Sequence, residues 1–425
     1  MRLCVKRNKS GSVLVMTLIL AAILGVTLGG YLYWVRTQNL LVAQSQAWNA
    51  AMAMAEAGVE EAMSQINTTF GTNYHSSALT NFGPLTAGAY GPRSNSLGGG
   101  SYAVLIIPTN PGPTIIATGY AHVPILSRPV QRVVRVTTTT RPAFDKAMVA
   151  LLDIVFNGNN ITVDSFDSTD PLHSNMGGYS RSLRKAGGEV VSTFGTINVN
   201  NANINGKLLT GPSGTFNLGP NGFAGDLNFT GPGIQDGWHA NDFNMEIDNV
   251  QPPDTSSFVT PTLLTTGTNK YELSSGGYII NGELKLTGDS ILVTGDVTLY
   301  VAGNLTMLGT SVINIEPGAN LTVYVAGEKA TFTQVNTTGY AGSFSYYGLP
   351  TNKSLSWTGN AEYKGSIYAP QAVFTCGGGG STEFDYQGAC VVKEVTLNGH
   401  FNFHYDEGLR LGKQSGFVVS SWKEL

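Results

Sequence analysis

The chain has 425 residues, of which 24 are Lys or Arg and 28 are Asp or Glu, so that only 12% of it is charged. This share is about half of the ~25% that is usual in soluble domains, and the 53 glycines, together with many Asn, Thr and Ser residues, are typical of strands and turns. The formal net charge of −4 excludes a basic nucleic-acid-binding protein, and the length predicts two or three domains with enough material for a buried core.

The N-terminus has the pattern of a membrane-spanning segment. Residues 1–10 carry four basic and no acidic side chains, and the run Gly11–Val35 that follows contains no charge. At ~1.5 Å per residue this run covers roughly 37 Å as a helix, more than the ~30 Å hydrocarbon core of a bilayer. Tyr31, Tyr33 and Trp34 stand where an interfacial aromatic belt would lie, and the basic leader predicts a cytoplasmic N-terminus. The alternative is a cleaved secretory signal, which has a shorter apolar core.

The helix is expected to continue beyond the membrane to residue 66. Its apolar positions recur at steps of three and four residues: Trp48, Met52, Ala55, Val59, Met63 and Ile66. Glu56 and Glu60 lie one turn apart on a different face, so the same helix combines an apolar stripe with an acidic edge. Ala21, Gly25 and Gly29 form a ridge of small residues that would let helices approach closely in lipid, although glycine is also simply frequent in membrane helices.

The basic leader ending at Gly11, the uncharged span directly after it, and the exit sequence AEAGVEEA at residues 55–62 together resemble type IV pilin-like proteins, in particular the PilX-type minor pilins. The resemblance covers residues 1–66. It implies that a prepilin peptidase cuts after Gly11 and leaves Ser12 as the mature N-terminus. The fifth mature position, a Glu in major pilins, is Met16 here. The usual salt bridge between pilin N-termini would therefore be missing, which disfavours ordinary assembly in the middle of a filament and is compatible with a minor or tip-associated subunit.

Three extended stretches follow the helix: Tyr102–Ile107, Thr114–His122 and Val130–Thr139. They predict a small antiparallel sheet packed on the helix, as in the head of the pilin-like fold that the resemblance implies. From about residue 143 the pattern changes to short β-branched runs punctuated by Gly and Asn.

An internal repeat predicts the architecture of this second region. The sequence VTLYVAG at 297–303 recurs as LTVYVAG at 321–327, an offset of 24 residues, and a weaker match at an offset of 23 relates Gly365–Ala369 to Gly388–Val392. Repeats of this length predict one coil each in a stacked β-solenoid, with amide side chains such as those of the Asn-rich stretch 198–203 forming ladders between coils. A β-sandwich built from hairpins is the alternative.

The expected fold is mainly β with one long N-terminal α-helix, in which a right-handed parallel β-helix follows a pilin-like helix and a small antiparallel sheet. The expected segments are a leader (1–11), a transmembrane and extended helix (12–66), a small pilin-like β region (67–142), a first solenoid part (143–250), a Pro/Thr-rich linker (251–270) and a C-terminal solenoid domain with a terminal cap (271–425). The stretch 365–410 resembles the β-helical domain that accompanies PilX-type N-termini. Because that domain has no assigned activity, the resemblance adds architecture and little chemistry.

Cys376 and Cys390 would lie outside the membrane, where oxidation is possible. We expect them to form a disulfide worth about 3 kcal/mol in the chain-entropy model, with the glycine run 377–380 helping the ends to meet. Two separate buried thiols are the alternative.

Metal binding has two candidate groups in the sequence. Asp164, Asp167 and Asp170 could offer oxygens to a calcium ion, but Asx turns explain the same residues, and the spacing leaves the question open. His400 and His404 alternate along one strand at roughly 13 Å, too far apart for one ion, and are expected at the surface or core edge. No metal site and no cofactor is therefore predicted.

The expected function is that of a non-enzymatic, membrane-anchored pilin-like subunit, a minor component of a type IV pilus or related secretion filament. The sequence contains no nucleophile elbow, phosphate loop or HExxH motif, and acids are sparse in the β region. The expected partners are the inner membrane, other pilin subunits or a second copy, and the prepilin peptidase, with no nucleic acid. The chain would cross the inner membrane once, with its C-terminal bulk periplasmic or on a surface filament.

Two alternatives belong to other functional classes. A carbohydrate-binding adhesin could stack Trp238 or Trp357 on the rings of surface glycans. A polysaccharide-degrading β-helix enzyme would need convergent carboxylates. The candidate carboxylates are few. Glu383 and Asp385 are expected on one strand face, whereas Asp406 and Glu407 are adjacent and are expected to point apart.

Overall fold

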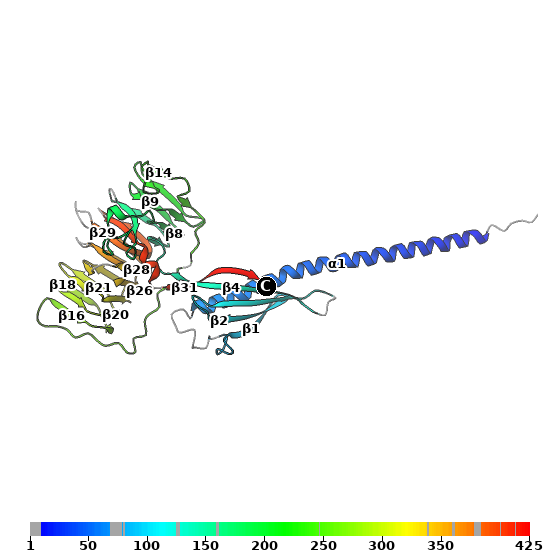
Figure 1. The fold of residues 1–425 in the computed structure, drawn as a ribbon, viewed down its shortest axis with the longest axis horizontal. Helices are drawn as coiled ribbons and strands as arrows, with labels where there is room; N and C mark the ends of the chain where they lie inside the picture. Colours follow the sequence, from blue (N-terminus) through cyan, green and yellow to red (C-terminus); the bar gives the residue numbers. More distant parts are fainter. Residues whose placement is uncertain are drawn as a thin grey trace, which may run out of the picture. The chain divides into compact units, whose positions relative to one another are not determined.

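The computed structural model describes residues 10–68, 79, 81–124, 128–158, 161–245, 247–337, 340–358, 362–377, 384–399, 401–412 and 414–425. The chain folds into two compact units (Figure 1): the first is Met1–Arg141 with Ser415–Leu425, and the second is Pro142–Gln414. The expected fold class is confirmed, because the protein is mainly β, with one long N-terminal helix, a small antiparallel sheet and a β-solenoid of about nine turns. The hand of the solenoid stays a prediction.

The first unit is built on the 59-residue helix α1 (Ser10–Thr68). Ala and Leu, both strong helix formers, are its commonest residues, and the absence of proline lets the backbone hydrogen bonds run without a break. Its N-terminal part is exposed in the isolated chain, and the helix is long and apolar enough to cross a membrane.

A five-stranded antiparallel sheet packs on the second half of α1, in the order β1 (Tyr90–Leu97), β2 (Gly100–Ile107), β3 (Thr114–Ala121), β4 (Val130–Pro142) and β31 (Gln414–Glu424). The three extended stretches expected from the sequence are β2, β3 and β4, and they alternate between buried and partly exposed residues as the pattern predicts. Strand β1 lies in a Gly- and Ser-rich stretch that carries no apolar alternation, so the sequence gives no sign of it.

The face that α1 buries differs in part from the expected stripe. Its buried hydrophobic residues are Ala47, Ala51, Ala55, Val59, Ala62 and Ile66. The expected Trp48 is 48% exposed, and the guanidinium of Arg132 lies 4.9 Å from its ring centre. Small residues replace it because helix and sheet meet closely: a Cβ added to Gly119 would lie 1.9 Å from the carbonyl oxygen of Ala51. Close approach, and not hydrophobicity alone, selects the buried face.

The second unit is the solenoid, whose coils consist of short parallel strands. Its N-terminal part comprises β5 (Met148–Ala150), β6 (Ile154–Phe156), β7 (Thr162–Phe166), the 3-10 helix η1 (Arg181–Leu183), β8 (Val190–Ser192), β9 (Thr196–Asn200), β10 (Asn203–Ile204), β11 (Leu208–Thr210), β12 (Thr215–Leu218), β13 (Phe223–Ala224), β14 (Gly233–Ile234) and β15 (His239–Ala240). Its C-terminal part comprises β16 (Asn269–Leu273), β17 (Gly276–Ile280), β18 (Leu284–Thr287), β19 (Ser290–Val293), β20 (Asp296–Val301), β21 (Leu305–Leu308), β22 (Val312–Ile315), β23 (Asn320–Val325), β24 (Lys329–Phe332), β25 (Val335–Thr337), the 3-10 helix η2 (Ala341–Ser343), β26 (Phe344–Gly348), β27 (Ser354–Trp357), β28 (Tyr363–Cys376), β29 (Phe384–Leu397), β30 (Phe401–Asp406) and the 3-10 helix η3 (Glu407–Leu411).

The repeats found in the sequence set the register of the coils. Strand β20 pairs with β23 so that Tyr300 lies opposite Tyr324, which is the offset of 24 residues. Strand β28 pairs with β29 so that Gly365 lies opposite Gly388, which is the offset of 23. The expected amide ladders also form, since Nδ2 of Asn217 donates to Oδ1 of Asn198 in the neighbouring coil at 2.9 Å.

The order of the coils in space differs from their order in the chain. Strand β29 pairs on one side with β28 and on the other with β5 and β6, and β30 pairs with β7. The N-terminal coils therefore stack on the last C-terminal coils, and one coil is completed by two distant chain segments, β30 and β5–β6. Figure 1 shows β14 and β16 toward opposite ends of this stack. One continuous hydrophobic core runs through both parts.

The segment 241–268 joins these two ends and packs along the outside of the solenoid. The amide of Phe243 donates to the carbonyl oxygen of Thr210 near one end. The hydroxyl of Tyr368 donates to the carbonyl oxygen of Asp248 midway, at 3.0 Å. Val259 forms a parallel bridge with Tyr278 at the other end. The strands of the first part thus end at residue 240, and the Pro/Thr-rich stretch 251–270 belongs mostly to this connection.

The C-terminus is not the solenoid cap that the sequence suggested. Strand β31 returns to the first unit and pairs with β4. The amide of Leu425 donates to the carbonyl oxygen of Val133 at 2.9 Å, and Oγ of Ser421 lies 2.5 Å from Oγ1 of Thr137. The solenoid is therefore inserted between two adjacent strands of the antiparallel sheet.

Candidate functional site: the exposed helix and the solenoid junction

The exposed part of α1 is the first candidate site. Ala21, Gly25 and Gly29 lie on it, and a Cβ added to either glycine would meet no atom within 4 Å. The small-residue ridge is thus open to a neighbouring helix, but association through it stays a prediction. Gly11 and Ser12 lie in the first turn of the helix, and their side chains are outside the described residues. Cleavage between them likewise stays a prediction.

The polar residues of the same helix separate into two kinds. Glu56 and Glu60 are exposed, as the sequence predicted. Glu61, the next acid, is instead tied to the sheet, because it forms an ion pair with Arg93 and its Oε2 accepts a hydrogen bond of 2.6 Å from the hydroxyl of Tyr102. Burial and this carboxylate both raise the pKa of Tyr102. Of the three acids, two remain available to a partner.

The second candidate site is the junction where β30 meets β7. Asp164 and His404 lie opposite each other in the register, and the distance between Oδ1 of Asp164 and Nδ1 of His404 is 2.5 Å. Oδ2 of Asp164 accepts a hydrogen bond of 2.8 Å from the hydroxyl of Tyr179, whose ring stacks on the imidazole with 3.5 Å between ring centres. Both members of the Asp164–His404 pair are buried. His404 is therefore an interior residue and not at the surface, whereas His400 lies outside the described residues.

The three aspartates considered as calcium ligands form hydrogen bonds within the chain. Asp164 is committed to His404 and Tyr179, as described above. Oδ1 of Asp167 accepts a hydrogen bond of 3.0 Å from the amide of Thr169, and Oδ1 of Asp170 accepts one of 2.9 Å from the amide of Leu172, which are Asx turns. Across the described ranges, no group of three or more His, Cys, Asp or Glu side chains is placed to hold a metal ion.

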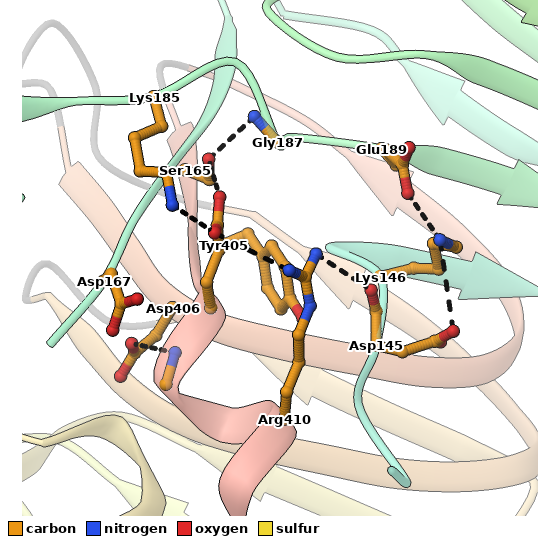
Figure 2. A network of polar contacts seen from close by, with 12 residues as sticks. Asp145, Lys146, Ser165, Asp167, Lys185, Gly187, Glu189, Tyr405, Asp406 and Arg410 are labelled. Atoms are coloured by element: carbon orange, nitrogen blue, oxygen red, sulfur yellow. Dashed lines mark hydrogen bonds and ion pairs between the residues drawn. The ribbon is translucent and has the colours of Figure 1, made fainter. Parts of the chain in front are cut away.

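Figure 2 shows the polar contacts that extend the junction into η3. Glu407 accepts a hydrogen bond of 2.8 Å from Oγ of Ser165, pairs with Nζ of Lys185 at 2.5 Å and lies 3.6 Å from the guanidinium of Arg410. Oγ of Ser165 in turn accepts a hydrogen bond of 2.7 Å from the amide of Gly187. Residues more than 200 positions apart in sequence are thereby fixed to one another.

Asp406 and Arg410 make further contacts in the network of Figure 2. Oδ1 of the buried Asp406 accepts hydrogen bonds of 3.0 Å from the amides of Ser168 and Gly408, and desolvation raises the pKa of this carboxyl in spite of them. The guanidinium of Arg410 lies 5.5 Å from the ring centre of Tyr405. The contacts of Glu407 with Ser165 and Lys185, and of Asp406 with Ser168, join two segments of the chain that are distant in sequence.

The expected disulfide is absent, because Cys376 and Cys390 are free and buried. The register explains why: Cys376 lies opposite Leu397 of the following coil, and Cys390 lies opposite Ile367 of the preceding one. The two thiols belong to different strand stretches of adjacent coils and point into one core. Burial raises the pKa of both thiols, so the reactive thiolate is suppressed.

The aromatic residues considered for sugar binding do not form an exposed platform. Trp357 is 1% exposed, and its indole Nε1 donates to the carbonyl oxygen of Thr333 at 2.9 Å. Trp238 is half-buried. Glu383 lies outside the described residues, as does the side chain of Asp385, so the carboxylate pair considered for an enzyme falls there too.

Sequence reasoning missed the junction. The partners of Asp164, Ser165 and Lys185 come from 404–407, and no local pattern connects the two regions. The available signal was the pattern of short β-branched runs punctuated by Gly and Asn, which both solenoid parts share. This pattern indicates stacked coils but not which coils are neighbours.

Comparisons with known proteins give two findings. Residues 240–411 match the model of a family described as Domain of unknown function (DUF7305), and no curated protein matches the chain. Among solved structures, the crystal structure of the competence-associated pilin ComZ from Thermus thermophilus matches at 12% identity, over 88% of this chain and 97% of that chain, with a TM-score of 0.28. The segment matched by the family contains the outer connection and the coils from β16 through η3.

Proposed function

We propose that the chain is a non-enzymatic, pilin-like structural subunit anchored in the inner membrane, a minor component of a type IV pilus or related secretion filament. Its task is to carry the solenoid outside the membrane. The observation that supports this proposal is the division of α1 into two halves, an apolar exposed half and a half that packs on the antiparallel sheet through small residues.

The exposed half of α1 is suited to both the membrane and the filament. Large apolar side chains from Val13 to Trp34 stand more than half exposed, which is unfavourable in water and natural in lipid or in a bundle of helices. Before polymerisation the segment would lie in the bilayer. In a filament the ridge of Ala21, Gly25 and Gly29 would contact the helices of neighbouring subunits.

The solenoid is suited to display. Asn side chains of neighbouring coils pair on its surface, and Glu407 at the junction binds Lys185 of the same chain. Hydrogen-bonded ladders and one continuous hydrophobic core are the features of a stiff stack of coils. Contacts with other subunits or with surfaces would use this outer part.

Processing tests the proposal most directly. The full chain is expressed with and without an active prepilin peptidase, and the mature N-terminus is read by mass spectrometry of the membrane fraction. We expect a chain beginning at Ser12 only when the peptidase is present. Gly11→Val should block the cut, whereas the matched control Gly25→Ala should leave it intact. Recovery of an uncut chain in the soluble fraction of peptidase-containing cells would refute the proposal.

Helix association is tested by oxidative cross-linking in the same membranes. Gly25→Cys should give a disulfide-linked pair of subunits, because the ridge brings this position close to its neighbour. Ile23→Cys, on the opposite side of the helix, is the matched control and should stay uncrosslinked. The experiment uses peptidase-containing membranes, where the cut after Gly11 would remove Cys4. The thiols of Cys376 and Cys390 do not interfere, since both are buried. Equal cross-linking at the two positions would exclude the ridge as the contact.

A further inference from the structure

A depression lies on α1 at the point where the uncharged run ends. Leu32, Val35, Arg36, Asn39 and Leu40 line it on one face of the helix, and Pro124 from the connection after β3 lines the opposite side. Its volume is about 400 Å³. The helical residues recur at steps of three and four, so they form one continuous stripe. Below them, Leu40 and Ala43 pack against the small cluster of Ala47, Ala51, Ala121 and Val123, which gives the depression a solid floor.

The depression combines aliphatic walls with a single positive charge. Arg36 is the only charged residue of the helix between Ser10 and Ala55. The next charge on the helix, Glu56, is twenty residues further on, or about 30 Å at the helical rise per residue. Among the parts of the chain that the structure describes, no hydrogen bond or ion pair to the Arg36 guanidinium is formed. The side chain therefore has a full set of donors for an anion, and Asn39, one turn further along, adds an amide.

The position of the depression defines the chemistry of its occupant. If the run from Val13 to Val35 lies in the hydrocarbon core, Arg36 reaches the level of the lipid phosphates, and Trp34 stands beside it in the interfacial layer. Leu32 and Val35 would then face acyl chains, and the guanidinium would face head groups. An amphipathic molecule with an anionic phosphodiester and an aliphatic chain matches both ends of the depression.

We propose that this depression binds one membrane phospholipid, with its phosphodiester on Arg36 and Asn39 and an acyl chain along Leu32 and Val35. The inference rests on the proposed membrane anchoring and extends it. A bound lipid would fix the depth of α1 in the bilayer and fill the gap beneath Pro124. The competing occupant is the helix of a second copy, which the test below distinguishes.

The test counts lipids on the intact protein. The full chain is reconstituted in vesicles of phosphatidylglycerol and phosphatidylethanolamine, extracted in a mild detergent and weighed by native mass spectrometry. We expect one retained phospholipid per chain. Arg36→Gln should lower its occupancy about fivefold, which corresponds to the ~1 kcal/mol typical of one basic residue at a lipid surface. Ala43→Trp should lower it as well, by filling the floor without changing the charge. Arg135→Gln, an exposed arginine of β4, is the control and should retain the lipid.

The outcomes separate this inference from the proposed function. A chain that appears in the soluble fraction contradicts the membrane anchoring itself. A chain that stays in the membrane but retains no lipid, or retains equal lipid in Arg36→Gln and wild type, overturns only the lipid site. A dimer mass without lipid assigns the depression to a second copy and also overturns it. Displacement of the lipid by inorganic phosphate alone would show that the acyl chain contributes nothing, which contradicts the proposal.

Discussion

The junction between the two solenoid parts can be tested by a single substitution, Glu407→Ala. This carboxylate accepts the hydrogen bond of Ser165 and pairs with Lys185 and Arg410, while its own side chain is only 10% exposed. A hydrogen bond to a charged group contributes ~1.5–3 kcal/mol. The partly exposed Lys185 regains solvent when the pair is lost, so the ion pair itself contributes little. We therefore expect a local loss of about 2 kcal/mol.

Hydrogen exchange of the intact chain measures this loss where it occurs. An opening free energy lowered by about 2 kcal/mol corresponds to about 30-fold faster exchange. The affected amides should be those of β7, β30 and Gly187, whereas the amides of β19, several coils away, should be unchanged. Glu316→Gln, an exposed acid in the turn after β22, is the matched control and should have no effect. Unchanged exchange at β7 in Glu407→Ala, or an equal increase throughout the solenoid, would refute the conclusion that Glu407 holds the two segments of the junction together.

Three further predictions use other features. Burial raises the pKa of Asp406 in the folded state. Its contribution to stability is therefore present below the unfolded-state pKa, near pH 4, and is lost as the pH rises through the folded-state pKa. Asp406→Asn should reduce this loss of stability with rising pH, measured as the midpoint of chemical unfolding from pH 4 to 8. Gly119→Ala should destabilise the helix and sheet by about 1–3 kcal/mol, since its Cβ would overlap the Ala51 carbonyl, whereas Gly99→Ala should melt like the wild type. Both solenoid cysteines should resist maleimide in the native protein and react once it is unfolded; rapid native labelling would contradict their burial.

The repetitive part of the fold could be predicted from the sequence because its information is local. A coil carries its own strand pattern, and the match of 297–303 to 321–327 gives the register of β20 on β23 directly. The helix was equally predictable, since an uncharged run followed by a three-and-four pattern has few other solutions. Its buried face was harder to assign. Trp48 fits the apolar stripe, but the sheet approaches too closely for an indole, and the alanines next to it are chosen instead.

The contacts that the sequence did not predict join distant segments. The residues near Asp164 in the sequence do not indicate that His404 is its partner. The residues 416–419 after the solenoid fit a cap or a strand equally well. The cysteine pair failed for a related reason. In a flexible chain, a short loop brings two residues near each other. In a solenoid, the length of the coil fixes the position of each residue, and Cys376 and Cys390 lie at different positions in adjacent coils.

The insertion of the solenoid between β4 and β31 has a mechanical consequence. The chain enters the stack just before β5 and leaves it after η3, and both elements belong to the one coil that two segments complete. Tension on α1 would thus reach the solenoid by two routes near the middle of the stack: the covalent link from β4 to β5, and strand β31, which is held to β4 by hydrogen bonds. A protease cut at either link would leave the solenoid attached through the other. Whole coils could be gained or lost at the two ends of the stack during evolution without changing these two connections.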